Sequence, residues 1–176
     1  MTRRGWGRIV ACALVFGVAA GTPAASWAQS DTPTVVILVR HAERADDGSE
    51  PDPPLSDRGR SRAECLAETL AHAGVTRVFS TPYLRTMHTA RPVAARLGLE
   101  VETYDPRSLG SFAASLDGMG GVVLVVGHSN TTPRLVEALG ADPVQPIAED
   151  EYDRLHTVFL SGTAVAGTLT RFCPAG

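Results

Sequence analysis

Short, uninterrupted apolar runs alternate with segments of helical periodicity along the chain. The runs are rich in β-branched residues, as expected of strands that are buried on both faces of a sheet. Their length of about five residues is typical of strands and too short for helices. The predicted strands are residues 35–39, 75–79 and 122–126, with a shorter candidate at 99–103.

Between these runs, apolar residues recur three and four positions apart, which predicts helices with one buried face. Capping residues mark their ends: Ser56 can accept hydrogen bonds at a helix start, and glycines favour helix termination. The first helix is predicted to follow Ser56 and to end near Gly74, the second to run from Pro82 to Gly98, and the third to follow His128 and end at Gly140.

The alternation of strands and helices predicts an α/β fold. Parallel strands that are joined by helices form a sheet covered on both faces, so we expect a three-layer αβα sandwich with a mainly parallel sheet. The pattern changes after Pro146: residues 155–160 and 163–172 flank Ser161-Gly162. This predicts a C-terminal antiparallel hairpin at the edge of the sheet.

The N-terminal 28 residues have the three-part pattern of a secretory signal peptide. Residues 1–8 carry three arginines and no acid, residues 9–21 are uncharged and largely apolar, and small residues precede a cleavage site after Ala28. The apolar run is shorter than the roughly 20 residues that a membrane-spanning helix requires. We therefore expect an exported protein, periplasmic or extracellular, with residues 29–176 as one domain and no stable membrane insertion after cleavage.

Composition excludes several functions. The 16 basic residues are all arginine, so Schiff-base chemistry and lysine-dependent phosphate loops are ruled out. Cleavage would remove three arginines and no acid, taking the net charge from −3 to −6. An acidic chain without a basic cluster does not indicate nucleic-acid binding. The three cysteines lack the paired spacing of zinc or iron–sulfur sites.

Candidate chemistry lies at the ends of the predicted strands. The first strand leads into Arg40-His41, the last parallel strand leads into His128 at a helix start, and Arg85 follows another strand. Ligands of open α/β sheets bind beyond the carboxyl ends of the strands. Helix starts and guanidinium groups favour anions. These residues therefore predict an anion pocket that is favourable for a phosphate.

Four segments resemble the histidine phosphatase superfamily, also called phosphoglycerate-mutase-like. They occur in the family's order within residues 35–172, and they are Arg40-His41, Leu55-Ser56 with Gly59, Ser80 to Ala90 with Arg85, and Gly127-His128-Ser129-Asn130. The resemblance implies that His41 is a nucleophile forming a phosphohistidine. It also implies that Arg40, Arg85, His128 and Asn130 bind the phosphoryl group of a small phosphorylated substrate, and that residues 29–176 are a histidine phosphatase domain.

The residue types suit this chemistry independently of the resemblance. Neutral imidazole is a competent nucleophile near pH 7, and guanidinium groups stabilise phosphoryl oxygens. No cofactor is expected, and a metal bound by both histidines with Glu43 is disfavoured because nearby arginines repel a cation. The family often uses a carboxylate as general acid, for which Asp105 and Glu43 are the candidates. Only 42 residues separate Arg85 from His128, which leaves little chain for a lid and favours hydrolysis over mutase chemistry.

Two alternatives remain. Gly127-His128-Ser129-Asn130-Thr131 resembles a nucleophile elbow, so Ser129 with Asp153 and His156 could form a serine hydrolase; however, Thr131 replaces the usual glycine. The second alternative is a non-catalytic module that binds a phosphorylated ligand. The acidic run at residues 149–153 is interpreted as a solvated loop.

The substrate stays open. The short form resembles bacterial phosphohistidine phosphatases of phosphorelays, whereas export favours an envelope phosphate or a scavenged phosphoester. A bridge between Cys65 and Cys173 is possible in an oxidising compartment, and the sequence does not fix the oligomeric state.

Overall fold

The computed structural model describes Met1, residues 32–45 and residues 51–173. The predicted signal peptide at residues 1–28 lies outside the described residues, apart from Met1. Within the described chain, no helix combines the length and the apolarity needed to cross a bilayer.

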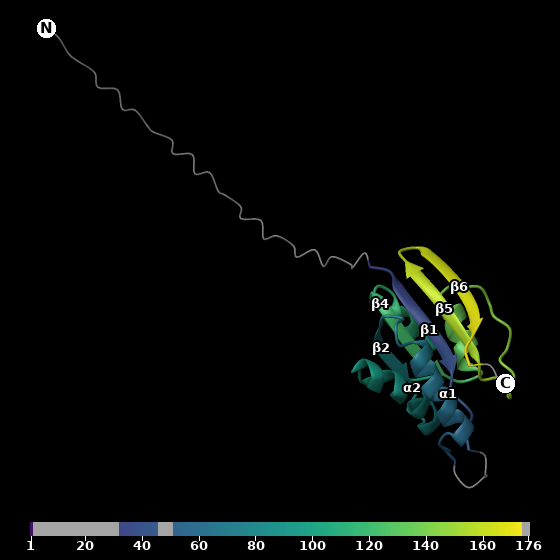
Figure 1. Ribbon diagram of the computed structural model, residues 1–176. Helices are drawn as coiled ribbons and strands as arrows, with labels where there is room; N and C mark the ends of the chain where they lie inside the picture. The colour runs from purple at the N-terminus through teal and green to yellow at the C-terminus, as the bar shows by residue number, and fades with distance from the viewer. Residues whose placement is uncertain (2–31, 46–50, 174–176) are drawn as a thin grey trace.

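A six-stranded sheet forms the centre of the molecule, in the order β3-β2-β4-β1-β5-β6 (Figure 1). The first four strands in this order are parallel, and β5 and β6 are antiparallel to their neighbours. The strand bounds are β1 Thr34–Arg40, β2 Val75–Ser80, β3 Val101–Thr103, β4 Gly121–Gly127, β5 Arg154–Ser161 and β6 Ala164–Arg171.

Four helices cover the two faces of the sheet. Helices α1 and α2 lie side by side on one face (Figure 1), and α3 and α4 pack on the other. Their bounds are α1 Asp57–Thr69, α2 Leu84–Leu97, α3 Leu109–Leu116 and α4 Thr131–Ala138. The predicted three-layer αβα sandwich with a mainly parallel sheet and an antiparallel edge hairpin is confirmed.

The alternation of side chains along β1 explains its uninterrupted apolar sequence. Val36 and Leu38 point into the core beneath α3 and α4, whereas Ile37 and Val39 point into the core beneath α1 and α2. Because both faces are covered, neither set can be polar. The register pairs Val36 with Val123 of β4 and continues to Arg40 beside Gly127. This register brings the first and second histidine segments to the same sheet edge.

Helix α3 was not expected from the sequence. It is only eight residues long, and its buried residues Leu109, Ala113 and Leu116 mark a single narrow face. Gly110 and two serines interrupt the helical pattern, and such residues are poor helix formers. Packing against α4 and the sheet outweighs this weak propensity.

A disulfide joins Cys65 of α1 to Cys173, with a Cα–Cα distance of 6.3 Å. The neighbouring Phe172 is buried in the core on the α1 side. The bridge therefore attaches the end of β6 to the first helix. The sequence left this pairing open.

Candidate active site

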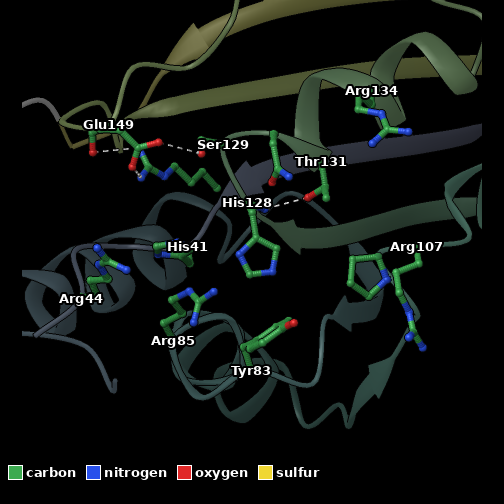
Figure 2. Close-up of a pocket in the computed structure, with 13 residues that line it drawn as sticks. His41, Arg44, Tyr83, Arg85, Arg107, His128, Ser129, Thr131, Arg134 and Glu149 are labelled. Atoms are coloured by element: carbon green, nitrogen blue, oxygen red, sulfur yellow. Dashed lines mark hydrogen bonds and ion pairs between the residues drawn. The ribbon is translucent and has the colours of Figure 1, made fainter. Parts of the chain in front are cut away.

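A pocket of about 590 Å³ opens at the carboxyl ends of β1, β4, β2 and β3 (Figure 2). The loops and helix starts that follow these four strands supply most of its wall, and the segment before β5 supplies the rest. Its lining residues are Arg40, His41, Arg44, Tyr83, Arg85, Pro106, Arg107, His128, Ser129, Asn130, Thr131, Arg134 and Glu149.

His41 is held in one orientation by its own segment. Its backbone N–H donates to the carbonyl of Gly127 at 2.9 Å, and its ring Nδ1 lies 2.8 Å from the carbonyl oxygen of Ala42. A carbonyl can only accept, so Nδ1 carries the proton. The other ring nitrogen, Nε2, therefore keeps its lone pair and is the atom able to attack an electrophile.

His128 lies beside His41, with a distance of 5.5 Å between the ring centroids. Its Nε2 is 2.9 Å from the hydroxyl of Thr81, and its backbone N–H donates to the hydroxyl of Thr131 at 2.9 Å. The packing here is tight: a Cβ on Gly127 would approach the hydroxyl oxygen of Tyr104 to 2.9 Å. Glycine at this position lets the end of β4 approach Tyr104 without a clash.

Both rings are neutral over most of the pH range. Burial lowers the pKa of His41 from 6.5 to about 3; the hydrogen bond to Ala42 opposes this shift and the charge of Arg40 reinforces it. Burial and then the charges of Arg85 and Arg40 lower the pKa of His128 to about 4. Deprotonated imidazole at His41 is the form that a nucleophile requires.

Arg40 is fixed by the segment that precedes β5. Its Nη1 donates to the carbonyl oxygens of Ala148, Glu149 and Glu151, and its Nη2 pairs with the Glu149 carboxylate at 3.1 Å. The Tyr152 ring stacks 4.2 Å from the guanidinium carbon. Residues 149–153 form a loop in which Glu149 and Asp150 are exposed, as interpreted from the sequence. The loop is also part of the site, because its main chain and the Tyr152 ring hold Arg40 at the pocket. The sequence carried no sign of this, since main-chain acceptors have no residue signature.

Arg85 is oriented by Asp52, a residue that the sequence analysis did not identify. The Asp52 carboxylate accepts from Arg85 Nη1 at 3.1 Å and from the backbone N–H of Leu84 at 2.9 Å. It thereby supports the first turn of α2, where a negative charge is favourable. Asp52 lies among prolines in a loop without periodicity, so no pattern distinguished it from other loop acids.

Glu43 lies outside the pocket lining, although it was a candidate general acid. Its carboxylate is bonded to Arg62 and Arg58 of α1, with the shortest contact of 2.8 Å to Arg62 Nη2. Burial alone would raise the pKa of Glu43, but these arginines outweigh burial and lower it. An ionised, fully paired carboxylate positions the segment after His41 and has no proton to donate.

Asp105, the other candidate acid, is also absent from the pocket lining. Its carboxylate accepts from Nε and Nη2 of Arg107, and these hydrogen bonds lower its pKa. Asn130, in contrast, lines the pocket. Asn130 precedes α4 without bonding its side chain to the helix, so its amide is available to a ligand.

The residues of the serine hydrolase alternative are not brought together. The Ser129 hydroxyl donates to the Glu149 carboxylate at 3.3 Å, and Asp153 pairs with Arg171. His156 is buried, and its Nε2 has no hydrogen-bond partner among the described residues. Ser129 therefore lacks the histidine base on which such a mechanism depends.

The pocket is strongly cationic although the chain is acidic overall. Five arginines and one carboxylate, Glu149, are among the described residues that line it. The Glu149 carboxylate contacts Arg40, and it also contacts Ser129 (Figure 2). A site with this charge distribution favours anionic ligands and gives them a single carboxylate neighbour.

Comparison with known sequences agrees with this geometry. Residues 36–106 match the family model of the histidine phosphatase superfamily, branch 1. The chain is 38% identical over 75 residues to phosphoserine phosphatase 1 of Hydrogenobacter thermophilus, which covers 40% of this chain and 36% of the relative. It is 35% identical over 77 residues to the probable phosphoglycerate mutase GpmB of Yersinia enterocolitica, covering 41% and 35%. The matches thus span about a third of the length of these curated relatives.

Solved structures match over a larger part of the chain. The protein histidine phosphatase SixA, in complex with tungstate, superimposes with a TM-score of 0.63 at 23% identity, covering 78% of this chain and 95% of SixA. A mycobacterial glucosyl-3-phosphoglycerate phosphatase gives a TM-score of 0.61 at 16% identity, covering 81% and 100%. Residues 36–106 are therefore similar in sequence to the histidine phosphatase superfamily, and the chain shares the fold of these solved phosphatases.

Proposed function

We propose that this protein is a metal-independent phosphatase that hydrolyses phosphomonoesters or phosphoramidates through a phosphohistidine on His41. The observation that carries the proposal is the state of the His41 ring. Its Nδ1 proton is bound to the Ala42 carbonyl, and its neutral Nε2 is left for attack. Among the similar proteins, several are named as phosphatases, which supports hydrolysis.

In the proposed reaction, His41 Nε2 attacks the phosphorus in line with the leaving group. A bond forms between nitrogen and phosphorus, and the bond from phosphorus to the leaving oxygen or nitrogen breaks. Water then attacks the phosphohistidine, which releases inorganic phosphate and restores the imidazole. Arg40, Arg85 and His128 surround the phosphoryl oxygens, where positive charge and hydrogen-bond donors stabilise the transition state.

The leaving group requires a proton when it is a poor one. We assign Glu149 as the proton donor, because it is the carboxylate among the described pocket-lining residues. In the ligand-free site, its carboxylate pairs with Arg40. A phosphoryl group that takes over Arg40 would release Glu149 beside the substrate, where its exposed carboxylate takes up a proton from solvent and transfers it to the leaving group.

The direct test is detection of the intermediate. Rapid quench of the enzyme with an aryl phosphate is expected to give a phosphorylated protein that is labile in acid and stable in base. His41→Ala is expected to lose both this species and turnover, whereas the control His72→Gln, which changes an exposed histidine outside the pocket, retains both. Full turnover by His41→Ala would contradict the proposal. Complete loss of turnover in Ser129→Ala, with an active wild type that forms no detectable phosphohistidine, would instead indicate a serine hydrolase.

A chelation experiment separates the metal-free mechanism from a metallophosphatase. Turnover is expected to be unchanged after dialysis against EDTA, because arginines supply the positive charge. Loss of activity that zinc restores would contradict the proposal. Binding of phosphate without any turnover would support the non-catalytic module.

A further inference from the structure

The phosphoryl group accounts for only part of the pocket. Phosphoryl oxygens of roughly the size of water, at ~30 Å³ each, fill on the order of 120 Å³, whereas the pocket measures about 590 Å³. The latter volume is in the range of sites for whole small molecules. The remaining space must therefore be matched to the rest of the substrate.

The pocket extends well away from the nucleophile. His41 follows β1 and Arg107 follows β3, and the sheet order places two strands between them. Strands lie about 4.8 Å apart, so the ends of β1 and β3 are separated by roughly 14 Å. Arg107 and Arg134 lie on the side of His128 that faces away from His41 (Figure 2).

Arg134 differs from the arginines that surround the phosphoryl position. Arg40 is bonded to residues 148–151 and Arg85 to Asp52. Arg134, in the middle of α4, lines the pocket and is exposed, and its side chain makes no hydrogen bond or ion pair with any residue in the described part of the chain. Its guanidinium keeps all its donors for a ligand.

Arg107 adds charge at the same end of the pocket but is partly neutralised. Two of its nitrogens are bonded to the Asp105 carboxylate, at 3.0 and 3.2 Å. Tyr83 and Pro106 also line the pocket, and the Tyr83 ring packs against His128 at 5.2 Å between centroids. These two side chains offer an uncharged wall to the body of a substrate.

Resting on the proposed phosphatase function, we propose that the substrate carries a second anionic group, a carboxylate or a second phosphate, which Arg134 binds with assistance from Arg107. The transferred phosphoryl group lies at His41 and His128, the body of the substrate lies over Tyr83 and Pro106, and the second anion lies at Arg134. Arg134 is thus a specificity-determining residue for this reaction.

The experiment compares matched ligands that differ in the second anion. Phosphoserine against phosphoethanolamine tests a carboxylate, and fructose 1,6-bisphosphate against fructose 6-phosphate tests a second phosphate. Affinities are measured by calorimetry on proteins carrying His41→Ala, so that no turnover occurs, and kcat/KM is measured on the same set with His41 intact. The variants are Arg134→Gln, Arg107→Gln and, as a matched control, Arg96→Gln in the last turn of α2 outside the pocket.

The unchanged pocket is expected to prefer the doubly anionic member of at least one pair by tenfold or more in affinity. Arg134→Gln is expected to reduce this preference at least fivefold, Arg107→Gln to reduce it less, and Arg96→Gln to leave it unchanged. No preference in either pair, or a preference that persists in the double variant of Arg107 and Arg134, overturns the inference. Absence of phosphate release from every substrate contradicts the proposed function instead, and the affinity ratios still decide the inference.

Discussion

Two carboxylates that the sequence offered as proton donors are used for structure, and a third lines the pocket. Glu43 is bonded to Arg62 and Asp105 to Arg107, whereas Glu149 contacts Arg40 at the site. Glu43 and Asp105 were candidates because each follows a predicted strand, but that position does not determine where the side chain points. A free arginine within reach captures a carboxylate wherever the chain brings the two together.

Replacing each of these carboxylates separates catalysis from structure. Glu149→Gln is expected to slow alkyl phosphates at least tenfold more than aryl phosphates, because aryl leaving groups need less protonation. Glu43→Gln and Asp105→Asn are expected to leave the alkyl-to-aryl rate ratio unchanged. The measurement is kcat/KM for both substrate types in all three variants. A ratio that Glu149→Gln does not alter would remove Glu149 from the mechanism.

The buried His41 ring links stability to pH. Its folded pKa of about 3 lies below the ordinary value of 6.5, so the unfolded state binds more protons between these values. The contribution of His41 to the free energy of unfolding is therefore fully present above about pH 6.5, and it decreases as the pH falls toward 3. At pH 5 the loss from His41 is about 2 kcal/mol, from 1.5 pH units at ~1.36 kcal/mol each.

Urea denaturation at pH 7 and pH 5 tests this prediction. The pKa values of His128, His88 and His156 are also lowered, so the wild type loses stability through several groups at once. The difference between wild type and His41→Ala gives the contribution of the His41 ring alone. The free energy of unfolding of the variant is expected to decrease by about 2 kcal/mol less than that of the wild type between pH 7 and pH 5. Equal losses in the two proteins would mean that His41 titrates normally.

At the scale of elements, the start of α1 is fitted against the segment that follows His41. The Ser56 backbone N–H and hydroxyl both donate to the carbonyl of Glu43, and the same hydroxyl accepts from the N–H of Gly59. A Cβ on Gly59 would lie 2.0 Å from the Glu43 carbonyl oxygen. The glycine in this helix therefore allows the close approach that holds the nucleophile segment in place.

Gly59→Ala is expected to destabilise the protein by roughly 2–4 kcal/mol, because the added methyl must displace main chain that is hydrogen-bonded. Gly110→Ala in α3 is the matched control. Nothing lies within 4 Å of the position that its Cβ would take, so this change is expected to stabilise the protein by about 0.5–1 kcal/mol. Thermal unfolding of both variants measures the contrast, and a neutral Gly59→Ala would show that the segment shifts easily.

Elements with a strong local sequence pattern could be predicted, whereas features that depend on contacts between distant segments could not. Strands β1 and β4 are recognisable because burial on two faces leaves only apolar residues, and α2 because its start follows Pro82 and Gly98 ends it in a left-handed conformation. Helix α3 lacks such marks. At the site, the histidine and arginine segments were identifiable from residue type and position, whereas Asp52 and Glu149 depend on contacts between distant segments.

At the scale of the whole molecule, the last strands are attached to the first helix in two ways. The Cys65–Cys173 disulfide closes a separation of 108 residues, and Arg62 Nη1 donates to the Cys173 carbonyl at 2.6 Å. Arg62 also binds Glu43 near the nucleophile segment. We propose that residues 1–28 direct export, as their sequence predicts, because oxidising compartments preserve bridges such as this one.

Removing the disulfide is expected to lower stability without dismantling the pocket, whose lining residues do not include either cysteine. In the chain-entropy model, a loop of this length stabilises the folded state by about 4–5 kcal/mol. For a chain of this size, that corresponds to a decrease in Tm of roughly 10 °C or more.

The experiment compares wild-type protein recovered from an oxidising compartment with the double variant Cys65→Ala/Cys173→Ala, each with and without reducing agent. Reduction is expected to lower the Tm of the wild type to that of the double variant and to leave the variant unchanged, while both retain phosphatase turnover at 25 °C. Two free thiols in the unreduced protein, or a Tm insensitive to reduction, would show that Arg62 and the buried Phe172 hold the end of β6 unaided.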